Sequence, residues 1–415
     1  MERFSRASYF MVALALFFFV YGPPLRLLPV NVSTLVGVIA WGFILRDPQL
    51  LAHIRTIKLE LMLLCLIIMY SVVLSMRGGD VGLMFAPVTI LLFNIPFCVW
   101  ISTIIVRMGH AEGVVPSRKL FGMLISIGII SAVLSVLLAL SPEAGEFVKF
   151  QVMKYDDVLM EFQSHRAFGL ADELLFSFSL VQGVIAIYLL RVYGIHVWSL
   201  VAVLLLLASC ALNARIGLLM IVVIPFAVRW SAARLLVVAV LLAGLGTFFS
   251  VSEHPTVVLI AEQSSYLVRE LGEALSGDIG GTVFEALLND MFFLPSEGWE
   301  LLFGSGENLF LDNSKNSDSG YVIMLGYGGL IYLTLVLLFV FACVVRKTSR
   351  RQNSFYMWVL AGTFLVANVK GLFFAAKPGM HLFLLVHIFF VIEARLTWLK
   401  AHQPPAVAGT FSRVL

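Results

Sequence analysis

Long apolar runs separated by short polar connections fill most of the chain. The runs are about 15 to 23 residues long and lack an alternation of period two, so they predict helices rather than strands. Because a backbone inside a bilayer must satisfy its own hydrogen bonds, we predict an all-α polytopic integral membrane protein with about twelve membrane-spanning helices. The predicted spans cover residues 7–22, 27–45, 59–75, 84–106, 120–140, 173–190, 197–213, 216–228, 235–250, 321–345, 356–375 and 381–397.

The composition agrees with lipid as the solvent of most of the surface. Hydrophobic residues make up 60% of the 415 residues and charged residues 13%, against roughly 25% charged residues in soluble proteins. Most of the 28 lysines and arginines fall in alternate connections, which by the positive-inside rule places these connections and both termini in the cytoplasm. The chain shows no histidine cluster with metal-ligand spacing, P-loop, dinucleotide fingerprint, nucleophile elbow or nucleic-acid-binding module. We therefore expect no metal, no cofactor and no nucleic-acid partner.

Two connections on the predicted outer side are long enough to fold. We expect a single transmembrane domain over residues 1–415, with a medium outer loop at 141–172 and a large one at 251–320. Loops of this length are usually functional or disordered. In the larger loop, apolar residues recur at helical spacing over 257–275, and the opposite face carries Glu262, Tyr266, Arg269 and Glu273. This pattern predicts a helical lid that lies over the outer face of the membrane.

Five basic side chains fall at or near the predicted outer face. A charge at membrane depth costs roughly 2.5–3.5 kcal/mol at the helix centre, so a chain that keeps one usually uses it. The planar guanidinium group in particular matches phosphate oxygens. We therefore predict a polyanionic ligand at this face, bound by Arg166, Arg215, Arg269, Lys370 and Lys377.

Most of these residues also have a structural interpretation. Arg215 can be a turn residue whose side chain reaches the membrane surface, and Lys370 and Lys377 can be interfacial anchors. Arg269 can pair with Glu262 or Glu273 on its own helix.

A polar stretch, LLFGSGENLFLDNSKNSDSG over residues 301–320, precedes the tenth predicted span. Its glycines permit a turn, and the GSG triplet is weak support for phosphate binding. Asp318 would lie at the positive N-terminal end of the following helix, where either Ser317 or Asp318 can act as the N-cap. The alternative is that Asp318 accepts a proton from a hydroxyl nucleophile, with Glu307 and Asp312 as the alternative bases.

Four sequence elements follow one another between residues 160 and 345. They are HRAFGLADELLFSFSL, NARIGLLMIVVI, the long outer loop ending in LLFGSGE, and SDSGYVIMLGYGGLIYL. In this order they resemble the Wzy-type O-antigen and polysaccharide polymerases, which form one superfamily with the O-antigen ligases. Ala214 stands where the family usually has a serine before the arginine of the second element.

The resemblance implies a C-type glycosyltransferase of the bacterial inner membrane that uses neither metal nor nucleotide sugar. It would polymerise undecaprenyl-pyrophosphate-linked oligosaccharides at the periplasmic face. The growing glycan would move to the non-reducing end of a new lipid-linked repeat, with release of undecaprenyl pyrophosphate. By motif, Arg166, Arg215 and Arg269 would engage the pyrophosphate, and Asp318 would act as the base. Membrane lipid and a chain-length regulator are the further partners that such a reaction allows.

Two other functions remain open from the sequence. An O-antigen ligase would transfer the glycan to lipid A core, but ligases place a histidine in the long outer loop and this chain has none between residues 255 and 380. A lipid-linked-oligosaccharide flippase or another transporter would also have about twelve spans. Such transporters usually show two similar halves, whereas this chain has one asymmetric outer loop.

Overall fold

The computed structural model describes residues 5–154, 169–172, 176–223, 292–294, 298–310, 317–346, 351–375 and 377–402, together with Val258, Glu262, Ser265, Arg269, Gly272, Glu273 and Ser276. Within these ranges the chain is helical, and the one strand-like contact is an isolated bridge between Leu25 and Met153. The α-helices are α1 (Arg6–Tyr21), α2 (Val32–Ile44), α3 (Pro48–Ile54), α4 (Lys58–Met76), α5 (Val81–Thr89), α6 (Ile95–Glu112), α7 (Pro116–Leu140), α8 (Pro142–Phe147), α10 (Ser177–Tyr193), α11 (Val197–Asn213), α16 (Trp299–Phe303), α17 (Gly320–Val345), α18 (Arg351–Lys370) and α19 (Lys377–His402). Short 3-10 helices are η1 (Arg55–Ile57) and η4 (Arg215–Val222), and single π-helical turns are η2 (Ile90–Asn94) and η3 (Val148–Val152).

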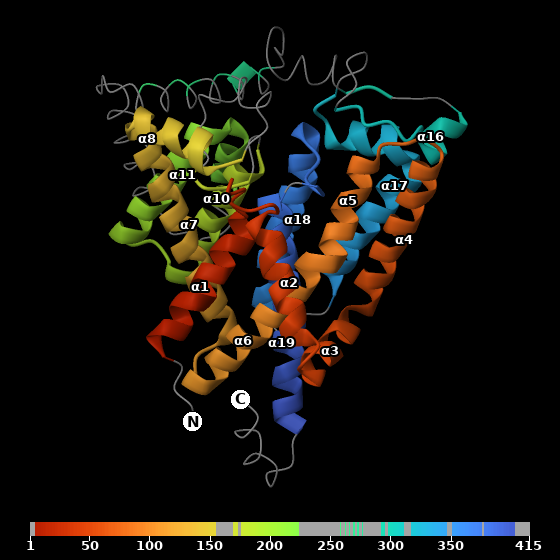
Figure 1. Ribbon diagram of the computed structural model, residues 1–415. Coiled ribbons are helices and arrows are strands. Elements are labelled where there is room, and N and C mark those ends of the chain that lie inside the picture. Colours follow the sequence, from red (N-terminus) through yellow and green to blue (C-terminus); the bar gives the residue numbers. More distant parts are fainter. Residues whose placement is uncertain are drawn as a thin grey trace.

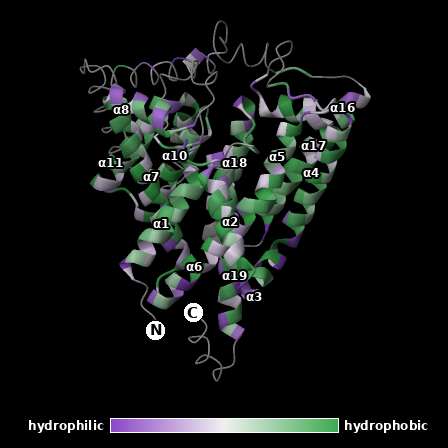
Figure 2. Ribbon diagram, in the orientation of Figure 1, coloured by the Kyte–Doolittle hydropathy of each residue, from purple (hydrophilic) through white to green (hydrophobic). Residues whose placement is uncertain are grey.

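The long helices run side by side and form a bundle (Figure 1). The first turn of α1 and the last turn of α19 lie at the same end, which is the lower end in this view, whereas α8 and α16 lie at the upper end. Hydrophobic residues cover the bodies of the helices, and hydrophilic residues gather near their ends (Figure 2). This distribution is that of helices solvated by lipid.

Five helical stretches in the described ranges have the length and composition to cross a membrane. They are Pro48–Met76, Val81–Glu112, Pro116–Leu140, Gly320–Val345 and Lys377–His402. The apolar helices α1, α2, α10 and α11 are shorter, with 13 to 17 residues. At 1.5 Å per residue they extend about 20 to 26 Å, less than the roughly 30 Å hydrocarbon core of a bilayer. The structure supports an all-α membrane protein, and the number of twelve spans stays a prediction.

Helix ends differ from the predicted spans where polar groups interrupt the helix. α2 begins at Val32 rather than at residue 27, because Asn31 is its N-cap. α18 ends at Lys370, and beyond it the amide of Phe373 donates to the side-chain carbonyl of Asn368 over 3.2 Å. The predicted span 216–228 starts with the 3-10 helix η4, while its residues from 224 onward and the span at 235–250 lie outside the described residues.

Helices α10 and α19 form much of the interior of the bundle. α10 is buried from Ser177 to Leu190, and α19, which packs against α6 and α10, is buried from Pro378 to Phe390. Lipid is as apolar as these side chains, so close packing through small residues holds such helices together. At Gly183 of α10, an added Cβ would lie only 2.6 Å from the side chain of Met220. This close contact holds η4 against α10.

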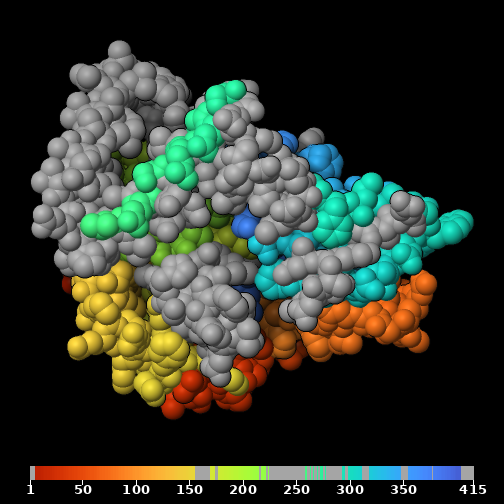
Figure 3. All heavy atoms as spheres, turned by 90° about the horizontal axis from the view of Figure 1, so that it is seen from above, coloured from red at the N-terminus to blue at the C-terminus, as the bar shows by residue number. Residues whose placement is uncertain are grey.

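The predicted lid helix falls mostly outside the described residues. The seven described residues between 258 and 276 are all helical, and Glu262 and Arg269 are exposed. Seen from above, these residues lie in a line across the end of the molecule that carries α8 and α16 (Figure 3). Their helical state agrees with the predicted helix, and its function as a lid stays a prediction.

Candidate functional site

Two lysine–aspartate pairs flank the turn between α18 and α19. Lys370, the last residue of α18, donates from Nζ to Oδ2 of Asp318 over 2.8 Å. Lys377, the first residue of α19, pairs with Oδ2 of Asp172. Both lysines and Asp318 were singled out from the sequence as separate residues. The fold makes Asp318 and Lys370 direct partners and places Lys377 at the other end of the same turn.

Asp172 ties the second pair to the N-terminal helices. Its Oδ2 also accepts a hydrogen bond from Nδ2 of Asn31 over 2.8 Å, and its amide donates to the carbonyl of Tyr21, the last residue of α1, over 2.8 Å. The Lys377–Asp172 pair therefore lies where α1 ends. α1 begins at the lower end of the bundle and has 16 residues, so this point is about 24 Å along its axis. That length is most of the roughly 30 Å thickness of the hydrocarbon core of a bilayer.

The first turn of α10 connects the start of α19 with the end of α11. The hydroxyl of Ser177 accepts a hydrogen bond from the amide of Gly379 over 2.7 Å. The hydroxyl of Ser179 donates to the carbonyls of Ala214 and Cys210, over 2.5 Å and 3.3 Å. Residue 214 is bonded to Arg215, so the backbone of Arg215 is held at the same turn of α10 as the beginning of α19.

The segment around Arg215 packs too closely against α10 to tolerate a side chain at Gly217. A Cβ at this position would lie 2.0 Å from Oγ and 2.5 Å from the carbonyl oxygen of Ser179. The glycine thus permits direct backbone contact between η4 and α10. The side chain of Arg215 itself lies outside the described part of the structure.

The turn between α18 and α19 is also packed against α10 and α17. A Cβ at Gly371 would lie 1.9 Å from the ring of Phe176, the residue just before α10. A Cβ at Gly320, the first residue of α17, would lie 2.5 Å from the carbonyl oxygen of Gly371. Phe176 and Gly320 therefore both contact Gly371 at this turn, and residues 214–217 contact the neighbouring Ser179 of α10.

Asp318 does not cap α17. The N-cap is Ser319, which makes no side-chain capping hydrogen bond, and the two candidates Ser317 and Asp318 precede it. Ser317 instead accepts the amide of Ser319 through its hydroxyl over 3.1 Å. The interpretation of Ser317 or Asp318 as the N-cap is therefore wrong, and the carboxylate of Asp318 turns toward Lys370.

The glycine-rich segment before α17 serves the fold rather than a phosphate. α17 is interrupted at Gly329, whose φ of 63° is left-handed, and such a break leaves carbonyls of the preceding turn without their helical donors. The amides of Ser305 and Gly306 supply those donors, to the carbonyls of Gly326 and Tyr327, each over 2.9 Å. The amide of Gly304 donates to the carbonyl of Glu300 over 2.7 Å, so all three GSG amides are used, which removes the weak support for phosphate binding there.

The other predicted site residues do not contact the lysine–aspartate pairs in the described part of the structure. Arg269 is 63% exposed and lies 3.6 Å from a carboxylate oxygen of Glu273 one turn along, so the structural interpretation of this residue holds in the structure. Glu307 is exposed, and its amide donates to the hydroxyl of Ser305 over 3.3 Å. Arg166 and Asp312 lie outside the described residues.

Buried polar groups without partners lie on the helices beside the Lys377–Asp172 pair. Both side-chain amide atoms of Asn213, the last residue of α11, lack a hydrogen-bond partner, although only 3% of the residue is exposed. In α10, Nε2 of Gln182 donates to the hydroxyl of Tyr21 over 3.3 Å, and its Oε1 is unsatisfied. Such groups are costly to bury without a partner, so they mark a place where water or a polar ligand would be stabilised.

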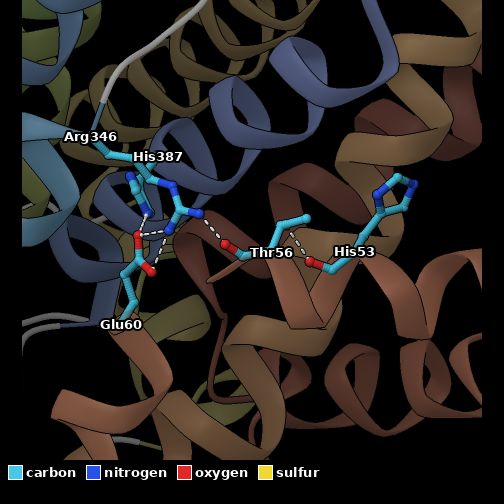
Figure 4. A network of polar contacts seen from close by, with 5 residues as sticks. All are labelled: His53, Thr56, Glu60, Arg346 and His387. Atoms are coloured by element: carbon cyan, nitrogen blue, oxygen red, sulfur yellow. Dashed lines mark hydrogen bonds and ion pairs between the residues drawn. The ribbon is translucent and has the colours of Figure 1, made fainter. Parts of the chain in front are cut away.

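A second charged network lies toward the lower end of the bundle (Figure 4). Arg346, just beyond α17, donates from Nη1 to both carboxylate oxygens of Glu60 and from Nη2 to the carbonyl of Thr56. Nε2 of His387 lies 3.1 Å from Oε1 of Glu60, and Glu60 and His387 are each 3% exposed. This network joins α4, α17 and α19, and its burial indicates a structural function.

Sequence reasoning missed several residues of both clusters. Asp172 lies inside the quoted element HRAFGLADELL, and Asn213 inside NARIGLL, so the motifs already contained them. Each is a polar residue in a motif that also contains an arginine, Asp172 with Arg166 and Asn213 with Arg215, and this was the signal that could have identified them. Glu60 and His387 are separated by 327 positions, and no periodicity of the sequence connects them.

The geometry favours binding of an anion that can exchange with the aspartates. The side chains of Lys370 and Asp318 are each 35% exposed, and that of Lys377 is 36% exposed, so the ammonium groups remain accessible to a ligand. Within the described ranges, no three His, Cys, Asp or Glu side chains are grouped as metal ligands would be. Neither protein-family models nor curated proteins give a match to the chain.

Proposed function

We propose that the chain is a membrane glycosyltransferase that polymerises oligosaccharide repeats carried on undecaprenyl pyrophosphate. The observation that carries the proposal is the pair of lysine–aspartate contacts around the α18–α19 turn, with the backbone of Arg215 fixed on the adjoining turn of α10. Each pair places a cation beside a carboxylate. The cations suit a pyrophosphate-binding site, and a carboxylate can act as the base that the reaction also needs. The resemblance to Wzy-type polymerases supports the same reaction.

In the proposed reaction, a hydroxyl oxygen of the acceptor sugar attacks the anomeric carbon of the donor glycan. The bond between this carbon and the pyrophosphate oxygen breaks, and its electron pair leaves with undecaprenyl pyrophosphate. Asp318 takes the proton of the attacking hydroxyl. Lys370, Lys377 and the arginines at 166, 215 and 269 stabilise the charge that develops on the leaving group, a type of stabilisation for which one donor is typically worth about 2.7–4 kcal/mol.

In the proposed reaction, the two lysine–aspartate pairs are the state of the site before the donor binds. Before the donor binds, each ammonium group is neutralised by its aspartate, which limits the cost of holding a charge near the membrane. When phosphate oxygens approach, Lys370 transfers its contact from Asp318 to the phosphate. The carboxylate is then released within reach of the acceptor hydroxyl. Binding of the donor thus prepares the base.

The location follows from the same proposal. We place the reaction at the periplasmic face of a bacterial inner membrane, with both termini in the cytoplasm and the upper end of the bundle toward the periplasm. The distribution of Lys and Arg supports this orientation.

A reconstituted assay tests the proposal. Purified protein in liposomes is supplied with an undecaprenyl-pyrophosphate-linked repeat, without nucleotide sugar and with a chelator present. We expect a ladder of products that differ by one repeat, together with free undecaprenyl pyrophosphate. Recovery of an unaltered but translocated substrate would indicate a flippase, and product formation only with a lipid A core acceptor would indicate a ligase. Either result contradicts the proposal.

A further inference from the structure

A groove opens on the side of the bundle at the end opposite the lysine–aspartate pairs. It is a shallow, open hollow with a volume of about 450 Å³. Its walls come from the first two turns of α1, the first three turns of α7 and the last residue of α10. The lining residues are Tyr9, Phe10, Ala13, Arg118, Lys119, Gly122, Met123, Ser126 and Tyr193.

One part of the groove is apolar and faces outward from the bundle. Phe10 is 65% exposed on the outer surface of α1, and Ala13 and Met123 continue this surface inward. Gly122 leaves the groove open, because a Cβ there would already approach the hydroxyl of Tyr193 to 3.4 Å. An apolar surface of this shape beside lipid-facing helices fits an acyl chain.

The other part of the groove is basic. Lys119 reaches the hydroxyl of Tyr9, lies 4.1 Å from the centre of its ring, and pairs with Glu112, so its charge is already neutralised. Arg118 is exposed, and within the described ranges its guanidinium makes no hydrogen bond or ion pair. The net charge offered to a ligand is therefore the positive charge of Arg118, which an anionic headgroup complements.

Aromatic residues place the groove at the level of a membrane surface. Tyr193 packs edge-on against Trp198 with ring centroids 5.0 Å apart, and Trp198 is 48% exposed. Tyrosine and tryptophan concentrate where helices leave the hydrocarbon for the headgroups. Tyr9 on α1 lies beside them on the same groove, so a ligand here meets both acyl chains and phosphates.

We propose that this groove binds an anionic glycerophospholipid. The phosphate would lie on Arg118, with the hydroxyl of Tyr193 beside it, and one acyl chain would follow Phe10, Ala13 and Met123. The shape and the charge carry the proposal together: an apolar groove alone would accept any lipid, and Arg118, whose guanidinium has no partner among the described residues, selects an anionic one. The inference is independent of the proposed transferase activity, because the groove is at the other end of the bundle.

The test is native mass spectrometry of the purified protein released from nanodiscs containing equal amounts of phosphatidylglycerol and phosphatidylcholine. We expect the wild-type protein to retain one phosphatidylglycerol in preference to phosphatidylcholine. Arg118→Gln should lower this preference about five-fold, the effect of one arginine on binding to an anionic lipid surface. Gly122→Leu, which fills the groove, should abolish retention of both lipids.

Matched variants separate the site from general charge and from misfolding. Arg55→Gln removes the same charge from an exposed residue at the lower end, outside the groove, and should retain phosphatidylglycerol as the wild type does. Ala13→Phe fills the groove from α1 and replaces Gly122→Leu if that variant does not elute as a folded monomer. Equal retention of both lipids by the wild type, or unchanged retention in both Arg118→Gln and the filled variant, would overturn the proposal. Displacement by equimolar undecaprenyl phosphate would overturn the assignment to a glycerophospholipid.

Discussion

Replacement of Asp318 by asparagine separates the catalytic interpretation of this residue from a structural one. The substitution keeps the size of the side chain and removes its charge. The Asp318–Lys370 pair is 2.8 Å long, but both side chains are 35% exposed, so solvent screens the attraction. Pairs of this kind contribute about 0.2–1 kcal/mol to stability. The melting temperature in nanodiscs should therefore fall by less than about 4 °C.

The effect on catalysis should be far larger. A positioned general base typically contributes a factor of about 10² to 10⁴ in rate. Initial rates of ladder formation in the reconstituted assay should therefore fall at least a hundred-fold in Asp318→Asn, which corresponds to about 2.7 kcal/mol or more. Glu307→Gln, at the exposed alternative base in the same polar stretch, is the matched control and should retain the wild-type rate.

A charge swap refines this test. The double variant Asp318→Lys with Lys370→Asp restores an ion pair between the two positions, but it moves the carboxylate to the end of α18. A pair with only a structural function would be rescued by the swap. The catalytic interpretation requires that stability recovers while the rate stays low. Recovery of the rate in the swapped protein, or a wild-type rate in Asp318→Asn, would exclude Asp318 as the catalytic base.

Three further predictions follow from the packing and charge of the described residues. Glu60→Gln breaks the ion pair with Arg346 in a buried network and should lower the free energy of unfolding by about 3 kcal/mol, measured by denaturation in nanodiscs. An unchanged free energy of unfolding would show that this network does not stabilise the fold. Gly217→Val forces a side chain onto Ser179, so it should cost about 1–3 kcal/mol and reduce product formation, and a fully active and stable variant would show that the position of η4 is unimportant. Arg269→Ala removes an exposed i,i+4 pair worth less than about 0.5 kcal/mol, so stability should not change while the rate falls; a normal rate would exclude Arg269 from pyrophosphate binding.

Most helices of the fold could be predicted from the sequence, because a long hydrophobic run indicates a helix that is solvated by lipid. The runs at 197–213 and 321–345, for example, correspond to α11 and α17 within one residue at each end. Helix ends were less accessible, since they depend on partners from elsewhere in the chain. The segment preceding Val32 shows this, because its last residue, Asn31, donates to Asp172, which lies 141 positions away.

The sequence identified several residues of the candidate site by their chemical type. It did not predict which residues they contact. A lysine near the end of a span stands out because a charge near the membrane is energetically costly, so Lys370 and Lys377 were identified individually. Their pairing with Asp318 and Asp172 depends on how α10, α17 and α19 meet, which periodicity does not report. The GSG triplet gave only weak support for phosphate binding. The amides of Ser305 and Gly306 instead donate to carbonyls beside the helix break at Gly329, a contact that the sequence pattern does not predict.

We propose above all that the upper end of the bundle holds a pyrophosphate through Lys370, Lys377 and Arg215. Binding of undecaprenyl pyrophosphate without any sugar, measured in nanodiscs by titration against undecaprenol, tests this claim without relying on turnover. We predict that the wild-type protein binds the pyrophosphate at least ten-fold more tightly than the alcohol, and that Lys377→Met and Arg215→Met each remove most of this difference. Equal affinity for the two lipids, or a preference that survives both substitutions, would show that these residues do not bind a pyrophosphate.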